Sequence, residues 1–112
     1  MTDYFTSKEI EGLNHSFVDR LVQARLYAAV PFIITSGART EVENANAQGV
    51  QNSAHLRGMA VDLACTDATA RYWILNGLLA AGFKRIGVYN RHIHVDNDHD
   101  LPEPVIWWGV SH

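Results

Sequence analysis

The sequence predicts one small domain that contains both helices and strands. The chain has 112 residues, of which 47% are hydrophobic and 19% are charged, and this supplies enough apolar material for one core but not for two. Two stretches repeat apolar residues at helical spacing, and short β-branched or apolar runs lie between and after them. We therefore expect residues 1–112 to form a single domain.

The composition excludes several classes of protein. Nine basic and twelve acidic residues give a net charge of −3 without a basic cluster, so nucleic acid is not an expected partner. Cys65 is the only cysteine, which excludes an internal disulfide. No apolar run approaches the roughly 18 residues that span a bilayer, and the N-terminus lacks a signal-peptide pattern. We expect a monomer made in the cytoplasm, without membrane insertion.

Two amphipathic or apolar stretches predict helices. The first covers residues 16–29, where apolar residues recur at helical spacing and Ser16 offers the N-terminal cap. The second covers residues 68–81 and follows two candidate caps, Thr66 and Asp67. The two helices together provide apolar faces that need a sheet or each other to cover them.

Short apolar runs predict the strands. These runs cover residues 32–35, 59–64, 85–89, 92–96 and 105–108, the last of which either adds a strand or packs across the core. Asn90 and Arg91 join the third and fourth runs as a hairpin. Residues 38–58 show no apolar period and predict a long loop, and loops of this length in compact domains are often functional.

The strand at residues 92–96 alternates polar and apolar side chains. A period of two puts His92, His94 and Asp96 on one face, with Ile93 and Val95 on the other. The apolar pair should face the core, so the polar face should border a cleft or solvent. An ordinary solvated strand face is the competing interpretation. The polar residues that follow are assigned mostly to solvent, namely Asp98, His99 and Asp100.

Asp62 is the one charged residue in the apolar run at 59–64. Burying an ionised carboxylate costs several kcal/mol unless it is paired or coordinated, so Asp62 requires a cation. One alternative is a buried ion pair with an arginine, for which the candidates are Arg39, Arg57 and Arg85. The other is a metal ion, because Asp62 with His55 and His94 would make an open three-ligand zinc site.

These residues resemble a known family. The motif Ser53-x-His55-x-x-Gly58-x-Ala60-x-Asp62, followed by His94-Val95-Asp96, is similar to that of the zinc-dependent peptidoglycan peptidases of the M15 type. That family includes D-alanyl-D-alanine carboxypeptidases, dipeptidases and phage endolysins. The resemblance extends from about residue 31 to residue 108, and includes the segments Ser36-Gly37-Ala38-Arg39 and Ile86-Gly87-Val88-Tyr89.

The resemblance implies both a fold and a cofactor. The fold would be a small α+β domain, shared by these peptidases and the hedgehog signalling domain, with helices packed on a mostly antiparallel sheet. The cofactor would be one Zn²⁺ ion in a cleft, with His55, Asp62 and His94 as its ligands because each occupies its motif position.

A zinc peptidase also needs a proton acceptor and donor. Several members of the family carry an acidic residue three positions before the last zinc histidine, and this chain has Arg91 there. His92 is the candidate for acid, base or oxyanion stabilisation, and its alternative is a surface histidine. Glu41, Glu43 and Asp98 are further candidates. Asp96 is expected to orient an imidazole as an outer-sphere partner of the metal.

Two residues of the long loop are candidates for binding substrate. Arg39 follows the first predicted strand, where its guanidinium would clamp a carboxylate of a peptidoglycan stem peptide. The alternative for Arg39 is a surface ion pair with Glu41 or Glu43. Ser53 would either contact substrate or turn the loop. Tyr89 and either Trp107 or Trp108 would line the cleft, although aromatic residues near apolar runs are more often core.

The expected function is hydrolysis of an amide bond in peptidoglycan stem or cross-link peptides, as in endolysins and D,D- or L,D-carboxypeptidases. An alternative is a zinc-containing cell-wall or protein binding module without a general base, for which Arg91 is the supporting feature. A metal-free domain with Asp62 paired to arginine requires the motif to be accidental. A phage lysis system that releases the protein to the cell wall fits the resemblance, and so does a bacterial enzyme that trims recycled wall peptides.

Overall fold

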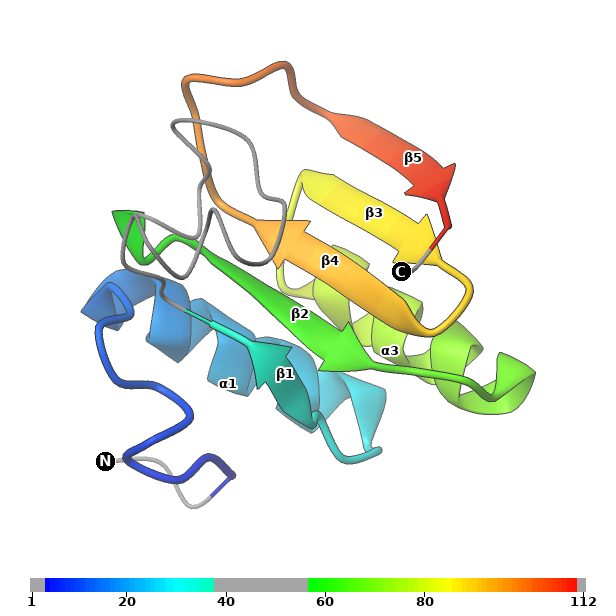
Figure 1. Ribbon diagram of the computed structural model, residues 1–112, viewed down its shortest axis with the longest axis horizontal. Coiled ribbons are helices and arrows are strands. Elements are labelled where there is room, and N and C mark those ends of the chain that lie inside the picture. The colour runs from blue at the N-terminus through cyan, green and yellow to red at the C-terminus, as the bar shows by residue number, and fades with distance from the viewer. Residues whose placement is uncertain (1–3, 38–56, 111–112) are drawn as a thin grey trace.

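The structure is a computed structural model, and it describes residues 4–37 and 57–110. Within these residues the helices and strands follow one another along the chain as shown in Figure 1. They are α1 (His15–Ala28), β1 (Ile34–Ser36), β2 (Ala60–Ala64), α3 (Ala68–Ala80), β3 (Arg85–Tyr89), β4 (His92–Asp96) and β5 (Val105–Gly109). The described residues therefore form a small α+β unit, as the sequence predicts.

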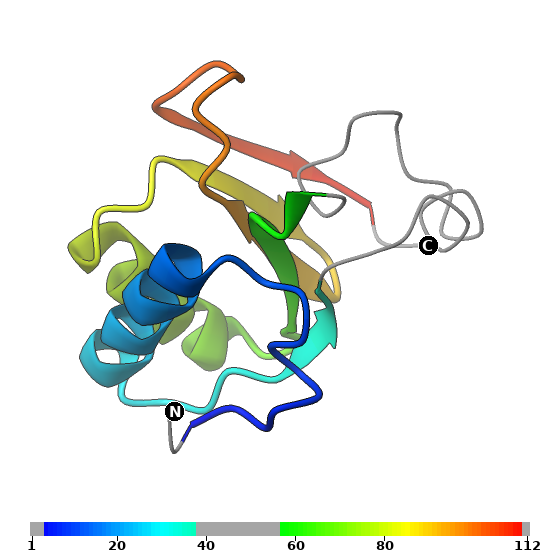
Figure 2. The same cartoon turned by 90° about the vertical axis from the view of Figure 1, so that its left-hand side faces the viewer.

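The strands form one five-stranded sheet in the order β1-β2-β4-β3-β5. The pairs β1/β2, β2/β4 and β4/β3 are antiparallel, and β5 runs parallel to β3 at the edge. The expectation of a mostly antiparallel sheet is confirmed. Both helices lie on one face of this sheet, and Figure 2 shows the two layers from the side. The opposite face, which we call the outer face, carries no helix among the described residues.

The core lies between the two helices and the sheet. Its fully buried side chains come from every layer, and they include Phe17, Leu21, Ile74, Leu78, Val61, Leu63, Ile93 and Val95. The helices approach each other closely at Gly77, where an added Cβ would lie 2.3 Å from the carbonyl oxygen of Ala24. A residue without a side chain is therefore required at this crossing.

Several predicted boundaries are confirmed and others shift. The hairpin strands occupy the predicted residues, and Asp67 caps α3 by accepting a hydrogen bond of 2.8 Å from the amide of Ala70. Helix α1 is capped by Asn14, because its Oδ1 accepts from the amides of Ser16 and Phe17 at 3.0 and 3.2 Å. The prediction of Ser16 as the cap is wrong, since Ser16 already lies inside the helix and its hydroxyl contacts Asn14.

The first strand lies two residues further along the chain than its predicted start, at Ile34–Ser36. Its pairing with β2 brings Ser36 opposite Asp62. In the part of the chain that the structure describes, no helix has both the length and the apolar character needed to cross a bilayer.

Candidate metal centre

The register of the sheet gathers polar residues on its outer face. Successive pairings align one residue from each strand in a row across the sheet: Ser36, Asp62, His94, Gly87 and Trp107. Paired residues on neighbouring strands project from the same face of a sheet. Asp62 and His94 are therefore neighbours at the centre of this row, although 32 positions separate them in sequence.

The side chains of Asp62 and His94 face each other directly. The Oδ1 atom of Asp62 lies 3.0 Å from Nδ1 of His94. Their side chains are 17% and 16% exposed, so the pair is accessible from the outer face without being fully solvated. Two of the three arginines offered as alternative partners make ion pairs elsewhere: Arg85 with Asp96, and Arg57 with Asp98 and Asp100. The third, Arg39, lies outside the described residues.

Asp96 holds the other side of the His94 ring. Its Oδ2 atom lies 2.7 Å from Nε2 of His94, and its Oδ1 accepts from Nε of Arg85 at 2.8 Å and from the amide of Asp98 at 3.1 Å. Asp96 is only 2% exposed. The expectation that all three polar residues of β4 border a cleft or solvent is thus wrong for Asp96, because Arg85 and His94 satisfy its charge inside the protein.

Carboxylates on both ring nitrogens determine the electrostatics of the pair. Burial alone would lower the pKa of His94, but the hydrogen bonds and charges of Asp62 and Asp96 outweigh it, and the pKa lies above its ordinary value. Burial likewise raises the pKa of Asp96, but His94, the Asp98 amide and Arg85 outweigh this effect and lower it. The site therefore attracts positive charge at the atoms that Asp62 and His94 direct toward each other.

These two side chains fit the donor set of a zinc ion. Tetrahedral zinc with ligand bonds of about 2.0–2.1 Å separates two ligand atoms by roughly 3.3 Å, and the observed pair lies at 3.0 Å. Metal-bound histidines commonly have a carboxylate on the second ring nitrogen, as Asp96 provides here. Residues 4–37 and 57–110 contain no group of three His, Cys, Asp or Glu side chains able to hold a metal. His55, the third predicted ligand, lies outside the described residues, as do Arg39 and Ser53.

The chain is anchored two residues after His55. Arg57 makes ion pairs with Asp98 and Asp100, and the carbonyl of Gly58 accepts a hydrogen bond of 2.9 Å from the Asn14 amide. Gly58 has a φ of +68°, and a Cβ there would lie 2.3 Å from a neighbouring backbone oxygen. Asp98 is 4% exposed, so its assignment to solvent is wrong, because Arg57 compensates its charge.

Aromatic side chains border His94 on the β3 side. The rings of His94 and Trp107 are 5.5 Å apart between centroids, and the Arg85 guanidinium lies 5.1 Å from the Trp107 ring. The indole Nε1 of Trp107 donates to the hydroxyl of Tyr89 at 3.0 Å, and Tyr89 stacks on His92 at 4.3 Å with an interplanar angle of 10°. We call Tyr89, His92 and Trp107 the aromatic wall.

The sequence indicates the aromatic wall only weakly. Tyr89 and Trp107 look like core residues in an apolar run, and their exposure on the outer face depends on β5 pairing with β3. Gly87 is the clearest signal, since a Cβ there would lie 2.7 Å from the Trp107 ring. This glycine allows the indole to lie across β3 toward His94. His92 was predicted to share a face with His94, and the strand alternation confirms that placement.

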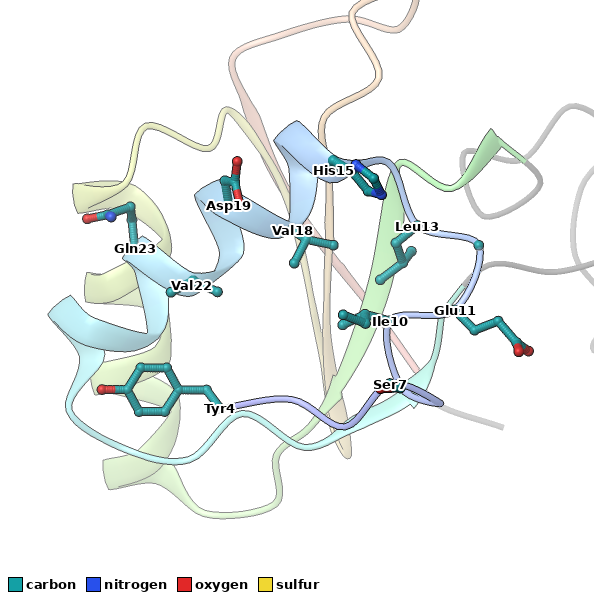
Figure 3. A pocket seen from close by; sticks show the side chains of 11 residues that line it. Tyr4, Ser7, Ile10, Glu11, Leu13, His15, Val18, Asp19, Val22 and Gln23 are labelled. Carbon is teal, nitrogen blue, oxygen red and sulfur yellow. The ribbon is translucent and has the colours of Figure 1, made fainter. Parts of the chain in front are cut away.

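A large groove lies on the other side of the molecule. It has a volume of about 1080 Å³ and is bounded by the N-terminal segment and the exposed side of α1, including Tyr4, Ile10, Val18 and Val22 (Figure 3). Helix α1 covers the face of the sheet opposite to the outer face (Figure 2). Asp62 and His94 do not line this groove, so the candidate chemistry and this groove are separate.

Comparison with known families identifies the chain. The family model described as Peptidase M15 matches residues 5–96. The chain belongs to the M15 peptidase family. The matched range includes Asp62, His94 and Asp96, together with every described element from α1 to β4. No protein with curated annotation matches the chain significantly.

Membership of the M15 family implies a peptidase with a peptide substrate. Within the M15 chain, the structure unites Asp62, His94 and Asp96 and places His92 on the same strand face. The sheet register thus brings together Asp62 of β2 and His94 of β4, which α3 and β3 separate in sequence.

Proposed function

We propose that the protein is a zinc-dependent peptidase that hydrolyses an amide bond in peptidoglycan stem or cross-link peptides, of the endolysin or carboxypeptidase type. The observation that carries this proposal is the facing pair of Asp62 Oδ1 and His94 Nδ1, with Asp96 behind His94, in an M15 chain. One domain, acting as a monomer, would perform this reaction. Synthesis in the cytoplasm and release to the cell wall through a phage lysis system would bring it to its substrate.

One Zn²⁺ ion would be held by His55, Asp62 and His94. When bound, the ion supplies a Lewis acid that polarises an amide carbonyl and lowers the pKa of water to near neutrality. Asp96 fixes the His94 ring by occupying Nε2, so that Nδ1 is directed toward Asp62. Arg85 in turn fixes Asp96, with an Nε to Oδ1 distance of 2.8 Å.

Proton transfer falls to His92 in this proposal. Its imidazole lies on the same strand face as His94, about 6.6 Å along the strand. Its ring is held parallel to Tyr89. From there His92 accepts a proton from the attacking water or donates one to the leaving amine, either directly or through one water. Asp96 is excluded as the general base because it is buried and bonded to Arg85 and His94.

Substrate recognition would involve the loop before β2. We assign the guanidinium of Arg39 to a carboxylate of the stem peptide, which it can bind through two parallel hydrogen bonds. Ser53 would contact the peptide backbone. The anchoring of Arg57 and Gly58 supports this arrangement, since it fixes the chain directly before β2, the strand that carries Asp62.

The experiment combines metal analysis with a digest. The purified protein is loaded with zinc, its bound metal is measured, and it is incubated with purified peptidoglycan, with new amines and muropeptide masses as readouts. We expect one zinc per chain and release of one type of amine. Asp62→Asn should lose both, whereas Asp19→Asn, on the exposed side of α1, should retain both.

The outcomes separate three interpretations. Absence of zinc affinity would contradict the metal site altogether. Bound zinc and binding to peptidoglycan without amine release would instead support the zinc-containing binding module, for which the exposed Arg91 at the β3–β4 turn is the supporting feature. Amine release that survives His92→Ala with an unchanged pH profile would remove His92 from proton transfer.

A further inference from the structure

We propose that the Tyr89 hydroxyl is a preoriented hydrogen-bond donor that binds an oxygen of the substrate peptide one to two residues from the cleaved bond. Trp107 is the positioning residue that fixes this donor. The inference rests on the proposed peptidase function and adds a specificity-determining residue to it. The juxtaposition that carries it is the contact of Trp107 with both His94 and the Tyr89 hydroxyl.

The direction of the Tyr89 proton follows from the chemistry of indole. The Nε1 group of Trp107 can only donate a hydrogen bond, and it lies 3.0 Å from the Tyr89 oxygen. Tyr89 therefore accepts this bond, and its own O–H remains to donate. Among residues 4–37 and 57–110, no group accepts that proton. A hydroxyl with an occupied acceptor site and an available proton is suited to bind a carbonyl or carboxylate oxygen.

The ring of Tyr89 is held on both sides. One face stacks on His92, with centroids 4.3 Å apart and an interplanar angle of 10°. Its edge lies against Gly109 of β5, where an added Cβ would come within 2.7 Å of Cε2. The glycine at this position thus provides the space that the ring occupies. Little conformational freedom is lost when such a fixed side chain binds a ligand.

The donor lies beside the candidate metal centre. Trp107 links the two, because its ring lies 5.5 Å from the His94 ring and its Nε1 contacts Tyr89. His92, on which Tyr89 stacks, is about 6.6 Å along β4 from His94. An extended peptide advances about 3.3 Å per residue, so a peptide that crosses His94 toward β3 reaches Tyr89 within one to two residues.

Two kinds of substrate oxygen have the required chemistry, an amide carbonyl and a terminal carboxylate. A hydrogen bond between neutral groups contributes less than one to a charged group. Removal of the donor should therefore weaken the interaction about threefold to tenfold for a carbonyl, and more than about tenfold for a carboxylate. A substrate whose terminal carboxylate is converted to an amide distinguishes the two acceptors independently. The effect of removing the Tyr89 hydroxyl should shrink on this substrate only if the carboxylate is the acceptor.

The test compares zinc-loaded wild type with Tyr89→Phe on a defined disaccharide-pentapeptide. Phenylalanine keeps the stack on His92 and removes only the hydroxyl. We expect kcat/KM to fall at least threefold while zinc affinity, measured by chelator competition, and Tm stay unchanged. Tyr72→Phe, an exposed tyrosine on α3, is the matched control and should behave as wild type. An unchanged kcat/KM in Tyr89→Phe, or an equal loss of zinc affinity, would overturn the inference.

A second variant moves the donor without removing it. In Gly109→Ala the new Cβ displaces the Tyr89 ring, and we expect a similar fall in kcat/KM with zinc affinity retained. If the wild type binds the muropeptide without cleaving it, the peptidase proposal fails, and the dissociation constants of the same variants test Tyr89. If the wild type neither binds nor cleaves it, both proposals are contradicted.

Discussion

The five residues of strand β4 alternate between two faces that differ in chemistry. Ile93 and Val95 point into the core and are fully buried against both helices. His92, His94 and Asp96 point to the outer face, where β2 and β3 provide their partners. The core face stabilises the domain and tolerates exchange of one apolar side chain for another. The outer face depends on individual atoms, since each ring nitrogen of His94 has its own carboxylate.

Substitution of a predicted ligand should separate the two faces most completely. In His94→Ala, zinc affinity and amine release should be lost beyond detection, because no other described side chain shares its position between Asp62 and Asp96. The change of Tm in the metal-free protein should be small beside that loss. Metal stoichiometry and thermal unfolding measure the two effects. If His94→Ala still binds one zinc per chain, the assignment of metal binding to the outer face is contradicted.

The core face should give the opposite pattern. Ile93→Ala removes a fully buried side chain on the same strand, and large-to-small substitutions of this kind cost about 2–5 kcal/mol of unfolding free energy. Zinc affinity of the folded fraction should change little. Chemical denaturation and chelator competition below the unfolding transition would test this, and a zinc affinity as weak as that of His94→Ala would contradict it.

Asp96 belongs to the outer face but is as buried as a core residue, so its substitution should affect both zinc affinity and stability to an intermediate degree. Asp96→Asn keeps the size of the side chain but leaves Arg85, which is 11% exposed, without its carboxylate partner. Outer-sphere substitutions typically weaken metal binding tenfold to a hundredfold. We expect a loss of zinc affinity in that range, with a lower Tm. If Asp96→Glu restores zinc affinity, the negative charge of Asp96 is what supports metal binding. If it does not, the position of the carboxylate is required as well.

The smallest expected effect lies far from the outer face. Asn14 caps α1 through the amides of Ser16 and Phe17, and removal of such a cap costs about 1 kcal/mol. Asn14→Ala should lower the unfolding free energy by about this amount, while Ser16→Ala should have a smaller effect. Urea titrations measure both unfolding free energies. If the two substitutions lower the unfolding free energy equally, Asn14 is not the dominant cap and Ser16 contributes as much to capping.

Local patterns made part of this structure predictable. The β3–β4 hairpin follows from two short runs joined by Asn90 and Arg91, and the Asp67 cap follows from a carboxylate at the helix start. The parallel pairing of β5 with β3 does not follow from either strand, because it depends on contacts across the intervening chain. From the sequence, Tyr89 and Trp107 were therefore offered as cleft residues but were not distinguished from core residues, although Gly87 and Gly109 mark where their rings lie.

The same distinction applies to the candidate site. The resemblance of two motifs to the M15 family implied that Asp62 and His94 meet, and the sheet register places their facing atoms 3.0 Å apart. The burial of Asp96 and Asp98 could not be predicted, because each depends on an arginine distant in sequence, Arg85 or Arg57. A charged residue in a polar run gives no sign of whether such a partner will reach it.

The most direct test of the central claim is a zinc titration of wild type and Asp62→Asn in competition with a chromophoric chelator. We predict one tight site per chain in the wild type and a loss of more than about a hundredfold in affinity in Asp62→Asn, beyond the effect of an outer-sphere residue. Equal zinc binding by both proteins, or none by the wild type, would contradict the assignment of Asp62 and His94 as metal ligands.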